Sequence, residues 1–118
     1  MQNFQLVLTE HLNHYGYLFG GTLLKWVDES AYIFARLDYP GRSFVTVAMD
    51  EVNFKERVEL GTILQFDVTK VYTGNTSVTY DVVVSSANDK ADKKPVIFST
   101  KVTFVAIGED GKKCALAA

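Results

Sequence analysis

The spacing of apolar residues changes once along the chain, from a helical period to an alternating one. Over residues 20–37, an advance of about 100° per residue gathers the apolar side chains on one side, which predicts a helix. This stripe consists of Leu24, Val27, Ala31, Phe34 and Ala35, and the opposite, polar side carries Lys25, Glu29, Tyr32 and Arg36. The helix should end at Tyr39-Pro40-Gly41-Arg42, because proline cannot continue it.

The rest of the chain is rich in β-branched and aromatic residues that alternate with polar ones, as in strands. We expect long strands at residues 44–54, 62–72, 76–87 and 95–107, after a shorter one at residues 5–9. In the last strand one face should carry Val96, Phe98, Val102, Phe104 and Ala106, and the other Ser99, Lys101 and Thr103. With no helix after the second strand, the sheet must be mainly antiparallel, which indicates an α+β fold.

Two turns complete this pattern. Gly74-Asn75 predicts a tight hairpin with a connection of two to four residues, and the charged residues 88–94 predict a solvated hairpin loop. The chain of 118 residues suits a single domain over residues 1–118, and its 47% apolar content is enough for one core without disulfides.

Composition argues against several functions. The net charge of -2, without a dense Lys/Arg run, disfavours nucleic acid as a partner. No apolar stretch approaches the roughly 20 residues needed to cross a membrane, and residues 1–10 lack the order of a secretory signal. Cys114 is the one cysteine, so it is interpreted as a bystander in a cytoplasmic protein. His11 and His14 are too few for a zinc site by themselves, so no metal is expected.

The start of the helix is the most informative feature. Gly20 and Gly21 open it, so the first N–H groups are uncovered and could polarise a carbonyl. Asp28 follows on or beside the apolar side, roughly 40° from Leu24, where a carboxylate needs a hydrogen-bond partner or a proton. A buried Asp can simply accept hydrogen bonds from a loop, and the glycines can simply save space. The glycine pair and the acid together favour a site that binds a carbonyl group and acts on it.

The helix carries more apolar surface than one sheet face can cover. Trp26, Ile33 and Leu37 point away from the main stripe, at roughly 200°, 180° and 220° from Leu24. Either the sheet curls far around the helix or a second subunit covers these side chains. We favour a homodimer.

These residues resemble a known family. Asn13-x-x-Gly16-x-x-Phe19-Gly20-Gly21, then Leu23-Leu24-Lys25-Trp26-Val27-Asp28, and Val45-Thr46-Val47-Ala48 with Asn53-Phe54, are similar to the hotdog-fold acyl-CoA thioesterases of the acyl-CoA hydrolase type. The resemblance implies a long central helix wrapped by a curved, antiparallel five-stranded sheet. It also implies edge-to-edge dimers, commonly assembled into hexamers (trimers of dimers), with the active sites at the dimer interface.

The resemblance also implies roles for individual residues. Asp28 matches the catalytic acid, and Asn13 matches an asparagine that works with it, delivered from the second subunit. Gly20 and Gly21 match the glycines whose N–H groups bind the thioester oxygen. Substrate contacts are further implied at Asn53, at Phe54 and in the turn Gly74, Asn75, Thr76 and Ser77, which is similar to one near the pantetheine arm. Arg57 replaces the usual proline and is a candidate contact for a phosphate of coenzyme A.

The function expected from these residues is hydrolysis of acyl-CoA, in which coenzyme A is part of the substrate and no cofactor is needed. Asp28 would act as general base toward water, or attack directly to form a mixed anhydride. One alternative is a hotdog dehydratase or hydratase acting on hydroxyacyl chains, in which His14 pairs with the helical carboxylate. Another is a non-catalytic acyl-CoA-binding sensor. Acyl-chain length, hexamer versus tetramer, and pathway are not set by the sequence.

Overall fold

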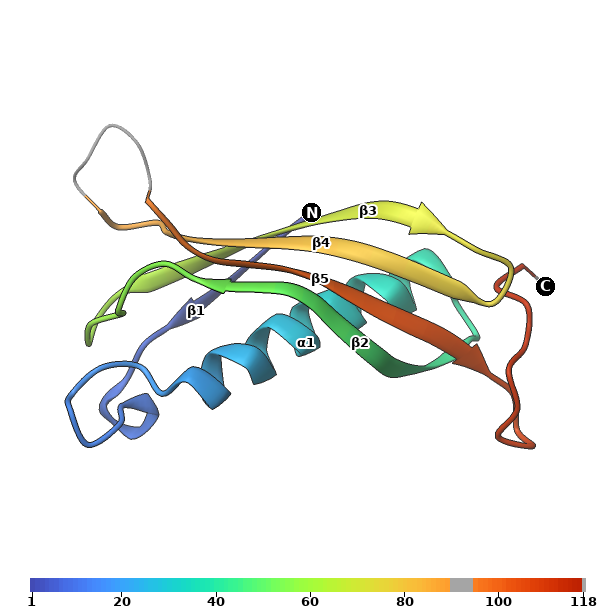
Figure 1. The fold of residues 1–118 in the computed structure, drawn as a ribbon, viewed down its shortest axis with the longest axis horizontal. Helices are drawn as coiled ribbons and strands as arrows, with labels where there is room; N and C mark the ends of the chain where they lie inside the picture. The colour runs from blue at the N-terminus through green and yellow to red at the C-terminus, as the bar shows by residue number, and fades with distance from the viewer. Residues whose placement is uncertain (90–94, 118) are drawn as a thin grey trace.

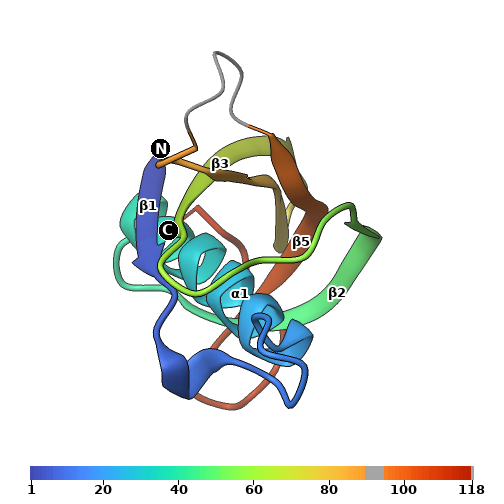
Figure 2. The ribbon, with the colours of Figure 1, turned by 90° about the vertical axis from the view of Figure 1, so that its left-hand side faces the viewer.

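One helix lies in the hollow of one curved sheet in this computed structural model, which describes residues 1–89 and 95–117. The elements are β1 (Gln2–Leu6), the short 3-10 helix η1 (Thr9–His11), α1 (Gly20–Asp38), β2 (Ser43–Phe54), β3 (Ile63–Thr73), β4 (Ser77–Ser86) and β5 (Val96–Ile107). The five strands pair antiparallel in the order β1-β3-β4-β5-β2. Figure 1 shows α1 running along the sheet, and Figure 2 shows the sheet curling around it. The predicted α+β fold is confirmed.

The strands lie close to their predicted positions, apart from the first. The limits of β2 to β5 differ from those predicted by at most one residue. The first strand lies at Gln2–Leu6 rather than at residues 5–9, because the chain turns into η1 after it. Imidazole Nδ1 of His11 accepts the Leu8 N–H at 2.9 Å and stabilises that turn. In β5 the predicted inner residues are buried except Val96, which is exposed at the beginning of the strand.

The buried side of α1 is rotated relative to the predicted stripe. Its buried residues are Leu23, Trp26, Val27, Ser30, Ala31, Phe34 and Ala35, whereas Leu24 is only partly buried. Trp26, predicted to point away from the main stripe and to need cover from the sheet or a second subunit, is buried within the chain, because the preceding loop folds back over it. The His11 ring contacts Trp26 edge-on, with 4.7 Å between centroids. Tyr32, expected on the polar side, is partly buried and lies 6.0 Å from the Phe104 ring.

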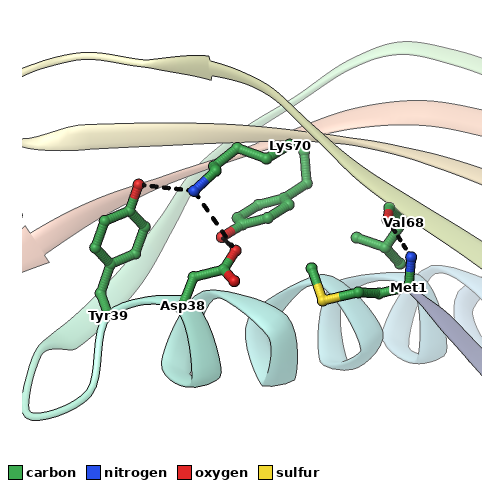
Figure 3. A network of polar contacts seen from close by, with 6 residues as sticks. Met1, Asp38, Tyr39, Val68 and Lys70 are labelled. Atoms are coloured by element: carbon green, nitrogen blue, oxygen red, sulfur yellow. Dashed lines mark hydrogen bonds and ion pairs between the residues drawn. The ribbon is translucent and has the colours of Figure 1, made fainter.

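A polar network ties the last turn of α1 to the sheet. The hydroxyl of Tyr80 on β4 donates to Asp38 Oδ2 at 2.7 Å. Lys70 on β3 places its Nζ 3.9 Å from the same oxygen and also donates to the Tyr39 hydroxyl at 3.3 Å. Figure 3 shows this network beside the bond from the Met1 amino group to the Val68 carbonyl. Burial, followed by the bond to Asp38, raises the pKa of Tyr80 far above its usual value, so Tyr80 stays a proton donor.

Some apolar side chains have no cover within one chain. Ile33 and Leu37 on α1 are 47% and 65% exposed, as the sequence predicts. Val45 and Val47 are also exposed on β2, which lies at one end of the strand order and therefore has an unpaired outer edge. Their covering by a second subunit stays a prediction.

The turns agree with the sequence where they are described. Gly41, with a φ of 84°, follows the end of α1, and the Gly74 N–H donates to the Ser77 carbonyl at 2.7 Å in the β3–β4 hairpin. Residues 90–94 of the predicted charged loop lie outside the described residues. Within the described part of the chain, no helix is long and apolar enough to cross a membrane.

Candidate active site

The loop that precedes α1 holds Asn13 in a fixed orientation. Asn13 Oδ1 accepts the backbone N–H of Tyr15 at 2.9 Å and that of Tyr17 at 3.2 Å, while its own N–H donates to the Tyr17 carbonyl at 2.7 Å. Gly16, with a φ of 84°, makes this tight loop possible. Because two N–H groups already occupy the side-chain oxygen, the Asn13 side chain presents its NH₂ group as a donor. It can therefore hold an acceptor such as a carbonyl oxygen or the oxygen of a water molecule.

The first turn of α1 leaves two backbone donors without a partner in the described chain. Phe19 is the N-cap, and its carbonyl accepts the N–H groups of Thr22 and Leu23 at 3.1 and 3.2 Å. No acceptor for the N–H groups of Gly20 and Gly21 is found among the described residues. Glycine at 21 also has a packing reason, because a Cβ there would lie 2.8 Å from the Phe19 ring. The space-saving and carbonyl-binding interpretations of the glycine pair are therefore compatible.

A pocket of about 570 Å³ opens at this helix start. Its apolar lining comes from Leu18, Leu23, Phe54 and Val58, and its polar lining from Asn13, Tyr15, Tyr17, Gly20, Lys55, Glu56 and Arg57. An apolar patch bordered by polar groups, beside uncovered N–H donors, suits a small acyl group bound through its carbonyl. The structure thus brings Asn13, Gly20, Phe54 and Arg57 together in one pocket of one chain, and their roles toward a substrate stay predictions.

Asp28 lies outside this pocket, at the edge of the buried face of α1. Its side chain is half-buried, and Oδ1 accepts the Thr46 hydroxyl of β2 at 2.7 Å. Asp28 lies eight positions after Gly20, and a rise of 1.5 Å per residue sets them about 12 Å apart along the helix. Asp28 therefore does not lie beside the first turn of its own helix, and its catalytic role stays a prediction.

Other predicted contacts lie away from the pocket. Asn53 is exposed and does not line it, although the adjacent Phe54 does, with its ring 4.7 Å from that of Phe98. A register shift between Asp50 and Asn53, with Glu51 at a φ of 56°, sets the direction in which these residues face. The turn of Gly74, Asn75, Thr76 and Ser77 joins β3 to β4 at the end of the sheet opposite the start of α1 (Figure 1).

Sequence reasoning missed two contributors to the site. Thr46 was noted only as part of a motif, yet it supplies the hydrogen bond to Asp28. Tyr17 lines the pocket, and the Arg57 guanidinium carbon lies 5.1 Å from the centre of its ring. A hydroxyl in the apolar run Val45-Thr46-Val47 was the available signal for the first. No sequence signal pairs Tyr17 with Arg57, because the two come together only through folding.

The two histidines and the cysteine do not line this pocket. His14 is exposed, with its ring 4.0 Å from that of Tyr15, and it does not line the pocket. In the described residues no three His, Cys, Asp or Glu side chains are grouped as a metal site would require. Cys114 is partly buried, and its N–H donates to the Ala106 carbonyl at 3.0 Å.

Comparison with known proteins decides the family. The model of the thioesterase superfamily matches residues 15–93, which include the glycine pair, Asp28 and strands β2 to β4. The chain belongs to the thioesterase superfamily. It is 32% identical to mouse acyl-coenzyme A thioesterase 11 over 95% of this chain, and 33% identical to Helicobacter pylori protein VdlD over 91%. It spans 19% of the mouse protein and 60% of the bacterial one.

Solved structures agree with this membership and define the fold. An acyl-CoA hydrolase of Staphylococcus aureus, solved with butyryl coenzyme A and coenzyme A, has a TM-score of 0.87 and 30% identity, over 98% of this chain and 70% of that one. A hexameric hotdog-fold thioesterase of Campylobacter jejuni has a TM-score of 0.85 and 31% identity, over 96% of this chain and 86% of that one. The fold of this superfamily member is thus the hotdog fold.

Proposed function

We propose that this thioesterase-superfamily protein hydrolyses acyl-CoA to a free acid and coenzyme A. The observation that carries the proposal is the pocket at the start of α1, which Gly20 and the fixed Asn13 line together with Leu18, Leu23, Phe54 and Val58. Relatives named as acyl-CoA thioesterases, and the Staphylococcus enzyme solved with butyryl coenzyme A, support this substrate class.

In the proposed reaction the thioester carbonyl binds at the helix start. Attack on this carbonyl places negative charge on its oxygen, where the N–H groups of Gly20 and Gly21 and the helix dipole stabilise it. Asn13 can add only a donor there, because its side-chain oxygen is already occupied. The role of Asn13 is therefore to donate a hydrogen bond from its NH₂ group, either to the carbonyl oxygen or to the oxygen of the attacking water.

Asp28 supplies the base in this proposal. The Thr46 hydroxyl holds Oδ1, which orients the carboxylate and leaves Oδ2 to accept a proton from water. The water oxygen then bonds to the carbonyl carbon, the carbon–sulfur bond breaks, and the thiolate of coenzyme A leaves with the bonding electrons. Direct attack by the Asp28 carboxylate, giving a mixed anhydride, is the other route that the same residue can take.

The site is built from two subunits in this proposal. A base about 12 Å along the helix from Gly20 cannot reach a water beside the carbonyl held there. A twofold dimer places Asp28 of one chain against Asn13 and Gly20 of the other, and it covers the exposed Ile33 and Leu37. We further propose a hexamer made of three such dimers, as hexamers are reported for the Campylobacter relative.

The remaining predicted contacts fit the same scheme. The turn from Gly74 to Ser77 carries the Thr76 and Ser77 hydroxyls, which suit the amides of a pantetheine arm. Because this turn and Asn53 lie outside the pocket, they reach one substrate only if another chain presents them. We propose this role for the turn of the neighbouring subunit.

Thiol release from short, medium, long and aryl acyl-CoA esters tests the function. The wild type should release thiol from at least one class, and Asp28→Ala should lower turnover about a hundredfold or more. Glu29→Ala is the matched control, because Glu29 is the adjacent carboxylate on the same helix and is exposed, in an ion pair with Lys25. Near-full activity of Asp28→Ala removes Asp28 from the chemistry.

Two readouts address the alternative functions. A dehydratase that uses His14 would hydrate enoyl-CoA and lose activity on His14→Ala, whereas the thioesterase should keep its thiol release in that variant. An acyl-CoA sensor would bind the ester, as calorimetry detects, without releasing thiol.

A further inference from the structure

Two arginines of this chain lie over tyrosine rings, and only one of these pairs faces the pocket. The Arg57 guanidinium carbon lies 5.1 Å from the centre of the Tyr17 ring, and that of Arg36 lies 5.9 Å from the centre of the Tyr32 ring. Arg57 and Tyr17 both line the pocket that contains Gly20, whereas Arg36 and Tyr32 do not. Arg36 is therefore a matched control for Arg57, because it is stacked on a tyrosine in the same way but lies outside the pocket.

The backbone fixes the Arg57–Tyr17 pair in place. Asn13 holds Tyr17 through two hydrogen bonds, at 3.2 Å to its N–H and at 2.7 Å from the Asn13 N–H to its carbonyl. The next N–H, that of Leu18, donates at 2.8 Å to the carbonyl of Val58, the residue after Arg57. The segments that carry the ring and the guanidinium are thus bonded to each other, which lowers the entropy lost when Arg57 binds a ligand.

The stacked Arg57 guanidinium can still bind an anion. Stacking uses its face, so the N–H groups at its edge can form two parallel bonds to a carboxylate or phosphate. In the described chain no ion pair involves Arg57 or Lys55, and Glu56 is the one acid among the pocket residues. Lys55 and Arg57 against Glu56 leave a charge of +1 at this rim.

We propose that Arg57, held against Tyr17, forms an anion subsite at the rim of the substrate pocket. This inference rests on the proposed acyl-CoA thioesterase function. A carboxylate at the free end of a short acyl group and a phosphate of coenzyme A offer the same chemistry. The geometry favours the carboxylate, because Arg57 and Gly20 line one pocket only about 10 Å across, taken as a sphere of its volume. The phosphates of coenzyme A are separated from the thioester by the long pantetheine arm.

Three ligands and two arginine variants test the subsite. Succinyl-CoA and butyryl-CoA have the same acyl length and differ by a terminal carboxylate, and S-butyryl-pantetheine lacks the phosphates. The KM of each is measured by thiol release, or the Kd by calorimetry if an ester is not turned over, for the wild type, Arg57→Ala and Arg36→Ala. We expect Arg57→Ala to raise the value for succinyl-CoA about tenfold, which corresponds to one charge-assisted contact, and to leave the other two unchanged.

The remaining outcomes are equally distinct. An equal rise for both coenzyme A esters, without one for the pantetheine ester, supports the subsite and identifies a phosphate as its anion. Values within twofold of wild type for all ligands, or the same rise for all three and for Arg36→Ala, overturn the proposal. If the wild type binds these esters without releasing thiol, the proposed function fails while the Kd values still decide the subsite.

Tyr17 has a positioning role that can be separated from its hydroxyl. Tyr17→Phe keeps the ring under Arg57 and should keep the preference for succinyl-CoA over butyryl-CoA, whereas Tyr17→Leu should reduce it as Arg57→Ala does. Arg36→Ala, whose arginine lies outside the pocket, should retain the kcat of the wild type for butyryl-CoA. A loss of preference in Tyr17→Phe as well would show that the hydroxyl, and not the stacked ring, acts on the ligand.

Discussion

Mixing two inactive variants should restore activity if each site takes residues from two chains. Asp28→Ala removes the base, and Asn13→Ala removes the donor beside the carbonyl. In a hybrid dimer, one site combines both alanines, and the other combines an intact Asp28 with an intact Asn13. Each hybrid dimer therefore has one complete site out of two.

The size of this recovery follows from the geometry. The roughly 12 Å helical rise between Gly20 and Asp28 excludes a complete site within one chain, because a base must lie within about 3 Å of the proton that it accepts. Random exchange of equal amounts of the two variants makes about half of all dimers hybrids. One working site in each hybrid gives about a quarter of the wild-type activity, against about a hundredth for either variant alone.

The assay is thiol release from a single acyl-CoA ester after the two variants are unfolded together and refolded. Each variant refolded alone and the wild type treated in the same way are the controls. Activity that stays at the level of the separate variants would falsify the two-chain site. Near-full activity of the Asn13→Ala variant alone would remove Asn13 from the reaction.

Three further changes test other parts of the structure. Thr46→Val should lower kcat about tenfold or more in kinetic assays, because the Asp28 carboxylate loses the hydrogen bond that orients it. Thr69→Val, at an exposed position, should leave kcat unchanged, and the same kcat for both variants would exclude the orienting role of Thr46. Tyr80→Phe should lower the free energy of unfolding by about 1.5–3 kcal/mol in urea titrations, because Asp38 loses a charge-assisted hydrogen bond; a change below about 0.5 kcal/mol would contradict this. Because the folded pKa of Tyr80 is raised, its contribution is complete below about pH 10 and is lost as the pH rises above that; Tyr80→Phe should lack this alkaline decline.

Local patterns in the sequence were sufficient for the elements and for part of the site. Alternation and the helical period depend on each side chain's position relative to its near neighbours, so strands β2 to β5 and α1 were predicted within one residue at each end. The glycine pair and Asn13 were found because the start of a helix and the loop before it are also local features. The first strand was misplaced because its end depends on the η1 turn, which the His11–Leu8 bond stabilises.

The tertiary structure decided which of these residues meet. Whether Trp26 is buried depends on a loop folding back over it, and the helical period carries no information about that loop. The contact of Thr46 with Asp28 and that of Tyr17 with Arg57 join residues 18 and 40 positions apart, counted as 46 minus 28 and 57 minus 17. The sequence by itself determined the fold class and the groups able to handle a carbonyl. Only the folded chain set the distances between them, because the curvature of the sheet and the packing of the helix bring together segments that no local pattern connects.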